Sequence, residues 1–264
     1  MTHPQLRAGL LAILFTTALA PLVLLVVVSL GSDWFYPAIL PRRMDVDPWR
    51  QFVTMDAGGR ITRAAVSSVI LAVATGVLAS LLALPIGRAL ARLKGWRRSV
   101  GAAAAFLPVA APPIALAVGL QYSFLRLGVA GTHTGVLMAH LVPAVGYTSL
   151  FFLGIFSTHD FRLEEEARNL GANAADRALR ITLPLMRRPL LEAFALGFLV
   201  SWAQVPLTLL VGQGLVTTLS VEVLSFVQSG QDRLAATGAI LLILPAMMML
   251  SLTALAIRRV GLQA

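Results

Sequence analysis

The stretch EEEARNLGANAADRALRITLPL, residues 164–185, decides how this sequence is interpreted. Seven of its 22 residues are charged, in a chain in which only 12% of all residues are charged. Long uncharged runs flank it, with 33 residues between Arg126 and Asp160 and 29 residues between Glu192 and Glu222. A polar segment between two such runs is typical of a loop that joins two membrane spans.

The same stretch carries the start and stop signals of two short helices. Asp160 and the glutamates after it suit a helix N-terminus, because carboxylates accept hydrogen bonds from unpaired amides and favour the helix dipole. Gly171 suits the left-handed residue that follows a helix, and Asn173 suits the cap of a second helix. Pro184 is expected to force Leu183 out of the helical region. The pattern therefore predicts a helix, a tight turn and a second helix.

Apolar runs dominate the rest of the chain. Its 264 residues are 58% hydrophobic and only 12% charged, with a mean hydropathy of +0.82. In soluble domains, by contrast, about a quarter of the residues are charged. A bilayer needs about 20 apolar residues per helix, and soluble helical hairpins would place charges every few residues. The sequence predicts an all-α integral membrane protein, with residues 1–264 as a single transmembrane domain. The six expected spans are near 10–30, 64–87, 100–122, 135–157, 193–213 and 235–257, and the loop is 158–192.

The distribution of lysine and arginine orients these spans. If both termini are cytoplasmic, 14 of the 21 basic residues lie in inside segments and seven lie outside, as the positive-inside rule requires. We therefore expect a multi-pass protein with cytoplasmic N- and C-termini. The first apolar run is too long for a signal peptide, whose apolar region has roughly 7–15 residues, so we expect an uncleaved anchor. Anionic membrane lipid, rather than nucleic acid, is the expected partner of the net charge of +9.

Prolines interrupt the expected spans. The stretch FLPVAAPPIALAVGLQY, residues 106–122, has three of them, so we expect its helix to be broken or strongly bent. Broken helices near mid-membrane often border a transport path, and the alternative at any single proline is a kink in a packed bundle. In the outer loop, DPWRQF at residues 47–52 is typical of a short interfacial helix.

Patterns for catalysis and metal binding are missing from the sequence. The chain has no cysteine, and its four histidines lack ligand spacing, so we expect neither a disulfide nor a metal site. It has no H-E-x-x-H motif and no G-x4-G-K-[ST] phosphate loop, so it is not expected to bind ATP itself. The six expected spans contain no acidic residue, which argues against the alternative of an ion-coupled secondary transporter.

The spacing inside residues 164–185 resembles a family signature. It is similar to the EAA motif of ABC importer permease subunits, which reads E-A-A-x3-G-x9-I-x-L-P. Glu166 departs from that motif, because the family usually has alanine there. The resemblance covers roughly residues 60–264, including GTHTGVLMAHLV before the motif and TTLSVEVL after it. The positions aligned with the motif are Glu165, Glu166, Ala167, Gly171, Ile181, Leu183 and Pro184.

This resemblance implies a type I ABC importer permease (MetI-like) bundle of six transmembrane helices in the bacterial inner (cytoplasmic) membrane. In that family, cytoplasmic coupling helices formed by the EAA loop dock into a groove on an ATPase subunit. ATP and Mg would be bound by that partner, so this chain would be non-catalytic and bind no cofactor. The other implied partners are a second permease subunit, identical or paralogous, and an extracytoplasmic substrate-binding protein. The implied ATPase-coupling residues are Glu165, Glu166, Ala167, Gly171, Ala172, Asn173, Ile181, Leu183 and Pro184.

By the same resemblance, the third to fifth spans would line half of the translocation pathway. For each polar residue there, a packing contact across helices is the alternative. The implied substrate is a small solute such as a polyamine, thiamine, ferric iron or an oxyanion, and a sugar is the alternative. The pathway candidates are Gln121, Tyr122, Tyr147, Ser201, Trp202 and Gln204, with His140 and Thr208 as further polar residues.

Overall fold

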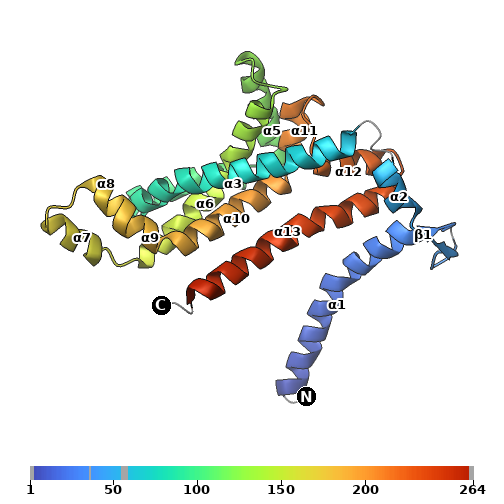
Figure 1. Cartoon of the computed structure of the whole chain (residues 1–264), viewed down its shortest axis with the longest axis horizontal. Helices are drawn as coiled ribbons and strands as arrows, with labels where there is room; N and C mark the ends of the chain where they lie inside the picture. Colours follow the sequence, from blue (N-terminus) through green and yellow to red (C-terminus); the bar gives the residue numbers. More distant parts are fainter. Residues whose placement is uncertain (1–2, 36, 55–58, 262–264) are drawn as a thin grey trace. The chain divides into compact units, whose positions relative to one another are not determined.

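The computed structural model describes residues 3–35, 37–54 and 59–261, and nearly all of them are helical (Figure 1). The chain divides into two compact units. One comprises Met1–Ala65 and Thr218–Pro245, and the other comprises Val66–Thr217 and Ala246–Ala264. The expectation of one transmembrane domain stays a prediction, as does the orientation of the termini, whose first two and last three residues lie outside the described ranges.

The first unit begins with a long apolar helix, α1 (His3–Leu30), which leads into a short antiparallel ladder of β1 (Gly31–Ser32) and β2 (Arg43–Met44). Next comes α2 (Asp47–Thr54), which confirms the short helix predicted at residues 47–52. The apolar side of α2 packs with the start of α3 (Arg60–Arg92), with α12 (Leu219–Gln228) and with the start of α13 (Asp232–Gly261). The buried cluster comprises Phe52, Ile61, Leu219, Phe226, Leu234 and Ala235.

Two ion pairs join elements of this first unit among the described residues. Arg60 Nη2 lies 3.0 Å from Oε2 of the buried Glu222, and Arg233 Nη2 lies 2.5 Å from Oδ1 of Asp45. The hydrogen bond from Arg233, with a second one from Ser32, holds the pKa of the Asp45 carboxyl below its usual value. A buried carboxylate is costly unless a cation pairs with it, so Arg60 makes the burial of Glu222 tolerable.

The second unit is a bundle built around α6 (His133–Thr158). Its partners are α4 (Gly95–Ala110) and α10 (Arg187–Trp202). In addition, α11 (Pro206–Gly212) packs on α6 and on α5 (Pro113–Arg126), beside which it lies in Figure 1. Glycines let the backbones approach closely. A Cβ added at Gly76 of α3 would lie 2.8 Å from the carbonyl of Phe194 on α10, and one at Gly146 of α6 would lie 2.7 Å from the carbonyl of Ala105 on α4. Small residues at crossings are the usual means of packing helices in membranes.

Within the described ranges, four helices are long and apolar enough to cross a membrane, and up to six spans result if each of two bent helix pairs forms one span. The pair α4–α5 bends by 93° and the pair α10–α11 by 61°. The first bend confirms the break expected within residues 106–122, because α4 ends at Ala110, Pro112 caps α5 and Pro113 begins it. The four long segments are Gly9–Leu30, Arg60–Arg92, His133–Thr158 and Asp232–Ala256.

Candidate functional site

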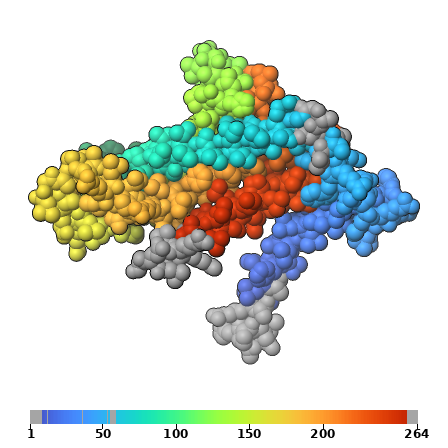
Figure 2. Space-filling view, viewed as in Figure 1, coloured from blue at the N-terminus to red at the C-terminus, as the bar shows by residue number. Residues whose placement is uncertain are grey.

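Residues 160–186 form a helical hairpin, called here the loop hairpin, between α6 and α10. Its helices are α7 (Arg162–Asn169), α8 (Ala174–Arg177) and α9 (Leu183–Leu185), with a π-helical turn, η2 (Ala178–Thr182), between the last two. Figure 1 places α7 and α8 at the end of the second unit opposite α5 and α11, and Figure 2 shows their yellow atoms exposed there. The charged stretch therefore forms an ordered, surface-exposed structure.

The predicted turn glycine, Gly171, and the predicted cap of the second helix, Asn173, occupy the expected positions, whereas the N-cap of α7 is Phe161 and not the expected Asp160. Asp160 Oδ1 accepts a hydrogen bond of 3.0 Å from the amide of Arg162, and Asn173 Oδ1 accepts one of 2.8 Å from the amide of Asp176. Gly171 has φ of +90°, a conformation that L side chains rarely adopt, and an added Cβ would meet no atom within 4 Å. Glycine is thus needed at this turn for its backbone conformation, not because space is short.

The expectation that Pro184 forces Leu183 out of the helical region is wrong. Leu183 has φ of −63° and ψ of −44°, which are helical values, and its amide bonds to the carbonyl of Ala178, five residues back. A proline ring normally clashes with the carbonyl four residues before it. Pro184, however, lies in the first turn of α9, directly after the π turn, where a helix tolerates proline.

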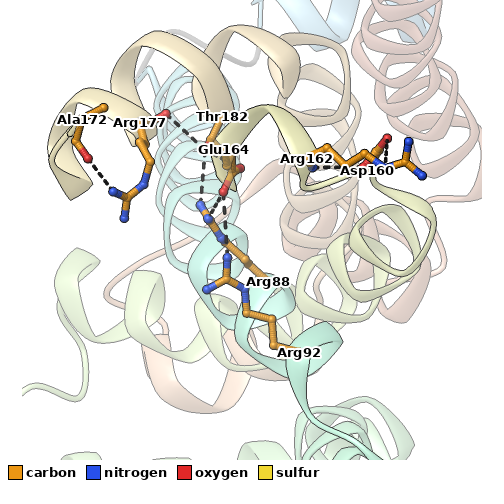
Figure 3. A network of polar contacts seen from close by, with 8 residues as sticks. All are labelled: Arg88, Arg92, Asp160, Arg162, Glu164, Ala172, Arg177 and Thr182. Atoms are coloured by element: carbon orange, nitrogen blue, oxygen red, sulfur yellow. Dashed lines mark hydrogen bonds and ion pairs between the residues drawn. The ribbon is translucent and has the colours of Figure 1, made fainter. Parts of the chain in front are cut away.

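A buried polar network attaches the loop hairpin to α3 (Figure 3). Glu164, only 4% exposed, forms an ion pair with Arg88 through Oε2 and accepts a 2.8 Å hydrogen bond from the Thr182 hydroxyl through Oε1. Arg88 also donates to Thr182 Oγ1 at 3.3 Å, and Arg92 Nη2 lies 3.9 Å from Glu164. Three segments, α3, α7 and η2, thus meet at one carboxylate.

An aromatic contact supports this attachment beside the network. The ring of Phe161 stacks on Phe156 of α6, with centroids 6.1 Å apart and planes at 12°. The guanidinium groups of Arg88 and Arg92 lie 5.9 and 5.2 Å from the Phe161 centroid, within the range of cation–π attraction. Phe156 itself belongs to a buried cluster with Met186, so the hairpin is fixed by apolar packing as well as by charge.

The predicted coupling residues differ in exposure. Glu165 and Glu166 project from α7 and are exposed, which keeps both carboxylates accessible to a partner. Ala167 and Ala172 are half-buried and close the turn through a 2.9 Å backbone hydrogen bond. Of the three residues at the end of the motif, Ile181 and Pro184 are half-buried, whereas Leu183 is 38% exposed.

The sequence did not identify the residues that attach the loop hairpin to α3. Glu164 stands one place before the motif, Thr182 occupies its variable position, and Arg88 belongs to a basic cluster explained by topology alone. The available signal was a glutamate followed 18 residues later by threonine, and it has no meaning until the hairpin brings the two side chains together. These three residues therefore hold the exposed motif residues in place.

Among the pathway candidates, Ser201 and Gln204 lie in a second polar cluster around His140. The His140 ring nitrogens Nδ1 and Nε2 lie 2.8 Å from Ser201 Oγ and 2.9 Å from Thr208 Oγ1. Thr208 donates its hydroxyl hydrogen to the carbonyl of Gln204 at 3.1 Å, so it accepts from Nε2–H of His140. Nδ1 then accepts from the Ser201 hydroxyl. The cluster bridges the break between α10 and α11.

The remaining candidates lie elsewhere in the second unit. Tyr122 of α5 is exposed, with the Arg126 guanidinium 4.6 Å from its ring centroid, and Tyr147 of α6 is 41% exposed. Gln121 is half-buried, and Trp202 is buried with its ring stacked on Phe198 at 5.7 Å. The contacts found among the described residues do not join Gln121, Tyr122 or Tyr147 to the His140 cluster.

The fold and the hairpin together define a multi-pass helical membrane protein with an ordered, charged loop between two of its helices. A family model described as "Binding-protein-dependent transport system inner membrane component" matches residues 83–262. The chain belongs to this family, which comprises the inner-membrane permeases of ABC importers. The predicted family resemblance is thereby confirmed.

Individual relatives agree with this assignment. The chain is 32% identical to the inner membrane ABC transporter permease protein YnjC of Escherichia coli K12 over 156 residues, which are 59% of this chain and 30% of YnjC. It is 22% identical to the spermidine/putrescine permease PotC of Haemophilus influenzae, covering 87% of this chain and 88% of PotC. It is 26% identical to the molybdenum permease ModB of Mycobacterium tuberculosis, covering 78% of this chain and 84% of ModB.

The fold also resembles that of a solved transporter. A crystal structure of a bacterial alginate ABC transporter in complex with a pentasaccharide-bound periplasmic protein contains a chain that aligns with a TM-score of 0.70. The alignment covers 97% of this chain and 94% of that one, at 14% sequence identity. This similarity supports the fold.

Proposed function

We propose that this chain is the permease subunit of an ATP-driven importer and that the loop hairpin couples it to a cytoplasmic ATPase. The chain would form half of a translocation pathway, and ATP hydrolysis would take place on the partner. The observation that carries the proposal is the loop hairpin itself. Its motif carboxylates are exposed on α7, while the neighbouring Glu164 is buried and tied to α3.

A rigid hairpin suits the coupling role for a physical reason. A flexible loop would absorb a push from a partner as local bending, whereas a packed, capped hairpin moves as one body. Capping at Asn173 and the ion pair at Glu164 supply that rigidity. By the family pattern, Glu165 would make the polar contact with the ATPase, and Gly171 would allow the turn.

The proposal includes six spans with cytoplasmic termini. The two bent pairs would each form one span, which adds two to the four long helices. The breaks at Pro112 and Pro206 would then face the pathway, because irregular backbone in a membrane needs protein or water around it. This arrangement also puts the loop hairpin on the cytoplasmic side, where an ATPase is available.

The proposed partners are the ATPase subunits, a second permease subunit and an extracytoplasmic binding protein. The family description names a binding-protein-dependent system, and the alginate transporter was crystallised with its periplasmic protein. For the substrate, we favour a polyamine or an oxyanion, because PotC is named for spermidine and putrescine and ModB for molybdenum, and both align over most of their length. A sugar is the second candidate.

The test is co-purification with the ATPase subunit of the same transporter, followed by ATP-dependent uptake in proteoliposomes containing the complete transporter. Glu165→Lys should lower ATPase retention at least about tenfold, since a charged contact at an interface is worth more than about 1.4 kcal/mol. Asp232→Lys is the matched control, because it reverses an exposed carboxylate outside the hairpin. Equal retention by both variants would contradict the coupling role of the hairpin.

A further inference from the structure

The loop hairpin and the end of α3 enclose a cavity, and Glu165 is the only one of its lining residues to which the coupling proposal gives an ATPase contact. Its volume is about 490 Å³, and it is open to the surface. Figure 3 shows two of its arginines, Arg88 and Arg92, converging from α3 on Glu164. The lining residues with charged or aromatic side chains are Arg88, Arg92, Lys94, Phe161, Glu164, Glu165, Arg168 and Arg177.

Positive charge is in excess around this cavity. Five basic residues line it against two carboxylates, and Glu164 already uses both oxygens, one with Arg88 and one with Thr182. Lys94 and Arg168 make no ion pair within 4.0 Å among the residues that the structure describes. An anion entering the cavity would therefore meet cations whose charge is not yet balanced.

The position of the cavity indicates where such an anion would come from. α3 is apolar enough to span a membrane, and Arg92 is its last residue. Arginine and lysine at the end of a span lie at the level of the lipid headgroups, where anionic lipid attracts them. The side chain of Arg92 is 59% exposed, so its guanidinium is accessible from outside.

We propose that this cavity binds the phosphate group of an anionic phospholipid such as phosphatidylglycerol. Guanidinium groups match phosphate oxygens in a fork geometry, and a lysine adds a point charge. Arg92 and Lys94 would hold the phosphate from the end of α3, and Arg168 would hold it from α7. A bound headgroup would thus cross-link the two elements already joined by Arg88 and Glu164. The binding does not depend on ATPase docking.

The experiment measures lipid binding by the full-length chain in phosphatidylcholine nanodiscs doped with fluorescent phosphatidylglycerol. Lys94→Gln with Arg168→Gln removes two exposed cavity cations that make no ion pair within 4.0 Å among the described residues, and it leaves the Arg88–Arg92–Glu164 network in place. The matched control is Arg97→Gln with Arg187→Gln, which removes the same charge from exposed residues that do not line the cavity. We expect the cavity variant to bind phosphatidylglycerol at least about tenfold more weakly, and the control to change less than about twofold.

The other outcomes overturn the proposal. Equal losses in both variants would show diffuse attraction to the basic surface. Competition by inorganic phosphate as effective as that by the lipid would assign the cavity to the free anion. Unchanged lipid binding in the cavity variant, with loss of ATPase co-purification instead, would assign the cavity to an acidic surface of the ATPase. Because the ATPase is absent from the lipid assay, failure of the coupling proposal would leave the lipid result unaffected.

Discussion

The Nδ1 atom of His140 lies 2.8 Å from the hydroxyl oxygen of Ser201, which joins α6 to the last turn of α10. Through Nε2 the same ring contacts Thr208 of α11, so one imidazole touches both sides of a 61° helix break. His140 has no exposed surface. We infer that it fixes the angle between the two helices.

Replacing His140 with leucine should destabilise the protein, because both hydroxyls lose their ring partner inside the bundle. Side-chain hydrogen bonds between membrane helices are worth about 0.6 kcal/mol on average, so the two together predict a loss of roughly 1–2 kcal/mol. Thermal unfolding in detergent measures it. Tyr147→Leu, an exposed site on the same helix, is the control and should change little. Equal losses of stability at the two positions would refute the inference that His140 fixes the angle between α10 and α11.

Glu164→Gln should destabilise the folded protein more than Glu166→Gln does. The first removes the charge that balances Arg88 in a buried network, and breaking a buried ion pair costs about 3–5 kcal/mol. Because the Arg88 side chain is 24% exposed and solvent weakens its ion pair, we expect Glu164→Gln to lower the free energy of unfolding by about 2–3 kcal/mol. The second change is on an exposed side chain and should stay within about 0.5 kcal/mol. A double-mutant cycle with Arg88→Met measures the coupling, and additive losses would show that the two residues act independently.

Gly171→Leu should strain the turn between α7 and α8. A left-handed residue with a Cβ costs about 1–2 kcal/mol, and relief of that strain would move the hairpin helices apart. Gly154→Leu is the matched control, because an added Cβ there also meets no atom within 4 Å, yet the residue lies within α6. We expect lower ATPase co-purification for the first variant only, with circular dichroism showing intact helices in both. Normal ATPase co-purification with Gly171→Leu would show that coupling does not require glycine at this left-handed turn.

Asp45→Asn should reduce the acid sensitivity of the first unit. Hydrogen bonding from Arg233 lowers the pKa of Asp45, so the pair stabilises the fold fully above the unfolded pKa of about 3.9. This contribution is lost as the pH falls through the lower folded value. Between about pH 6 and pH 3, the melting temperature of the wild type should therefore fall by more than that of the variant. In an Arg233→Gln background, Asp45→Asn should make a smaller difference to this loss, because only the hydrogen bonds from Ser32 and the Asp47 amide then lower the Asp45 pKa, and an undiminished difference would exclude the ion pair as its cause.

The sequence predicted the elements of the loop hairpin well because its signals are local. Capping by Asn173 and the left-handed turn at Gly171 each depend on a few neighbouring residues, and both are confirmed. The bend within residues 106–122 followed equally from proline chemistry. The failure at Leu183 is also local: Pro184 lies in the first turn of α9, and Leu183 before it keeps helical angles.

The contacts that hold the candidate site in place could not be predicted in the same way. Arg88 and Glu164 are 76 residues apart, and His140 and Thr208 are 68 residues apart. No periodicity or cap relates residues at such separations, so only the folded bundle brings them together. Burial also distinguished Glu164 from its neighbours Glu165 and Glu166, which are chemically identical to it in the sequence.

The attachment at Glu164 has a mechanical consequence. Covalently, the loop hairpin is connected only to α6 and α10, and a body held at two points turns about the line that joins them. Arg88 supplies a third point of support on α3. A third support away from that line stops the rotation, so a load on α7 would displace α3 together with the hairpin instead of being dissipated as a twist.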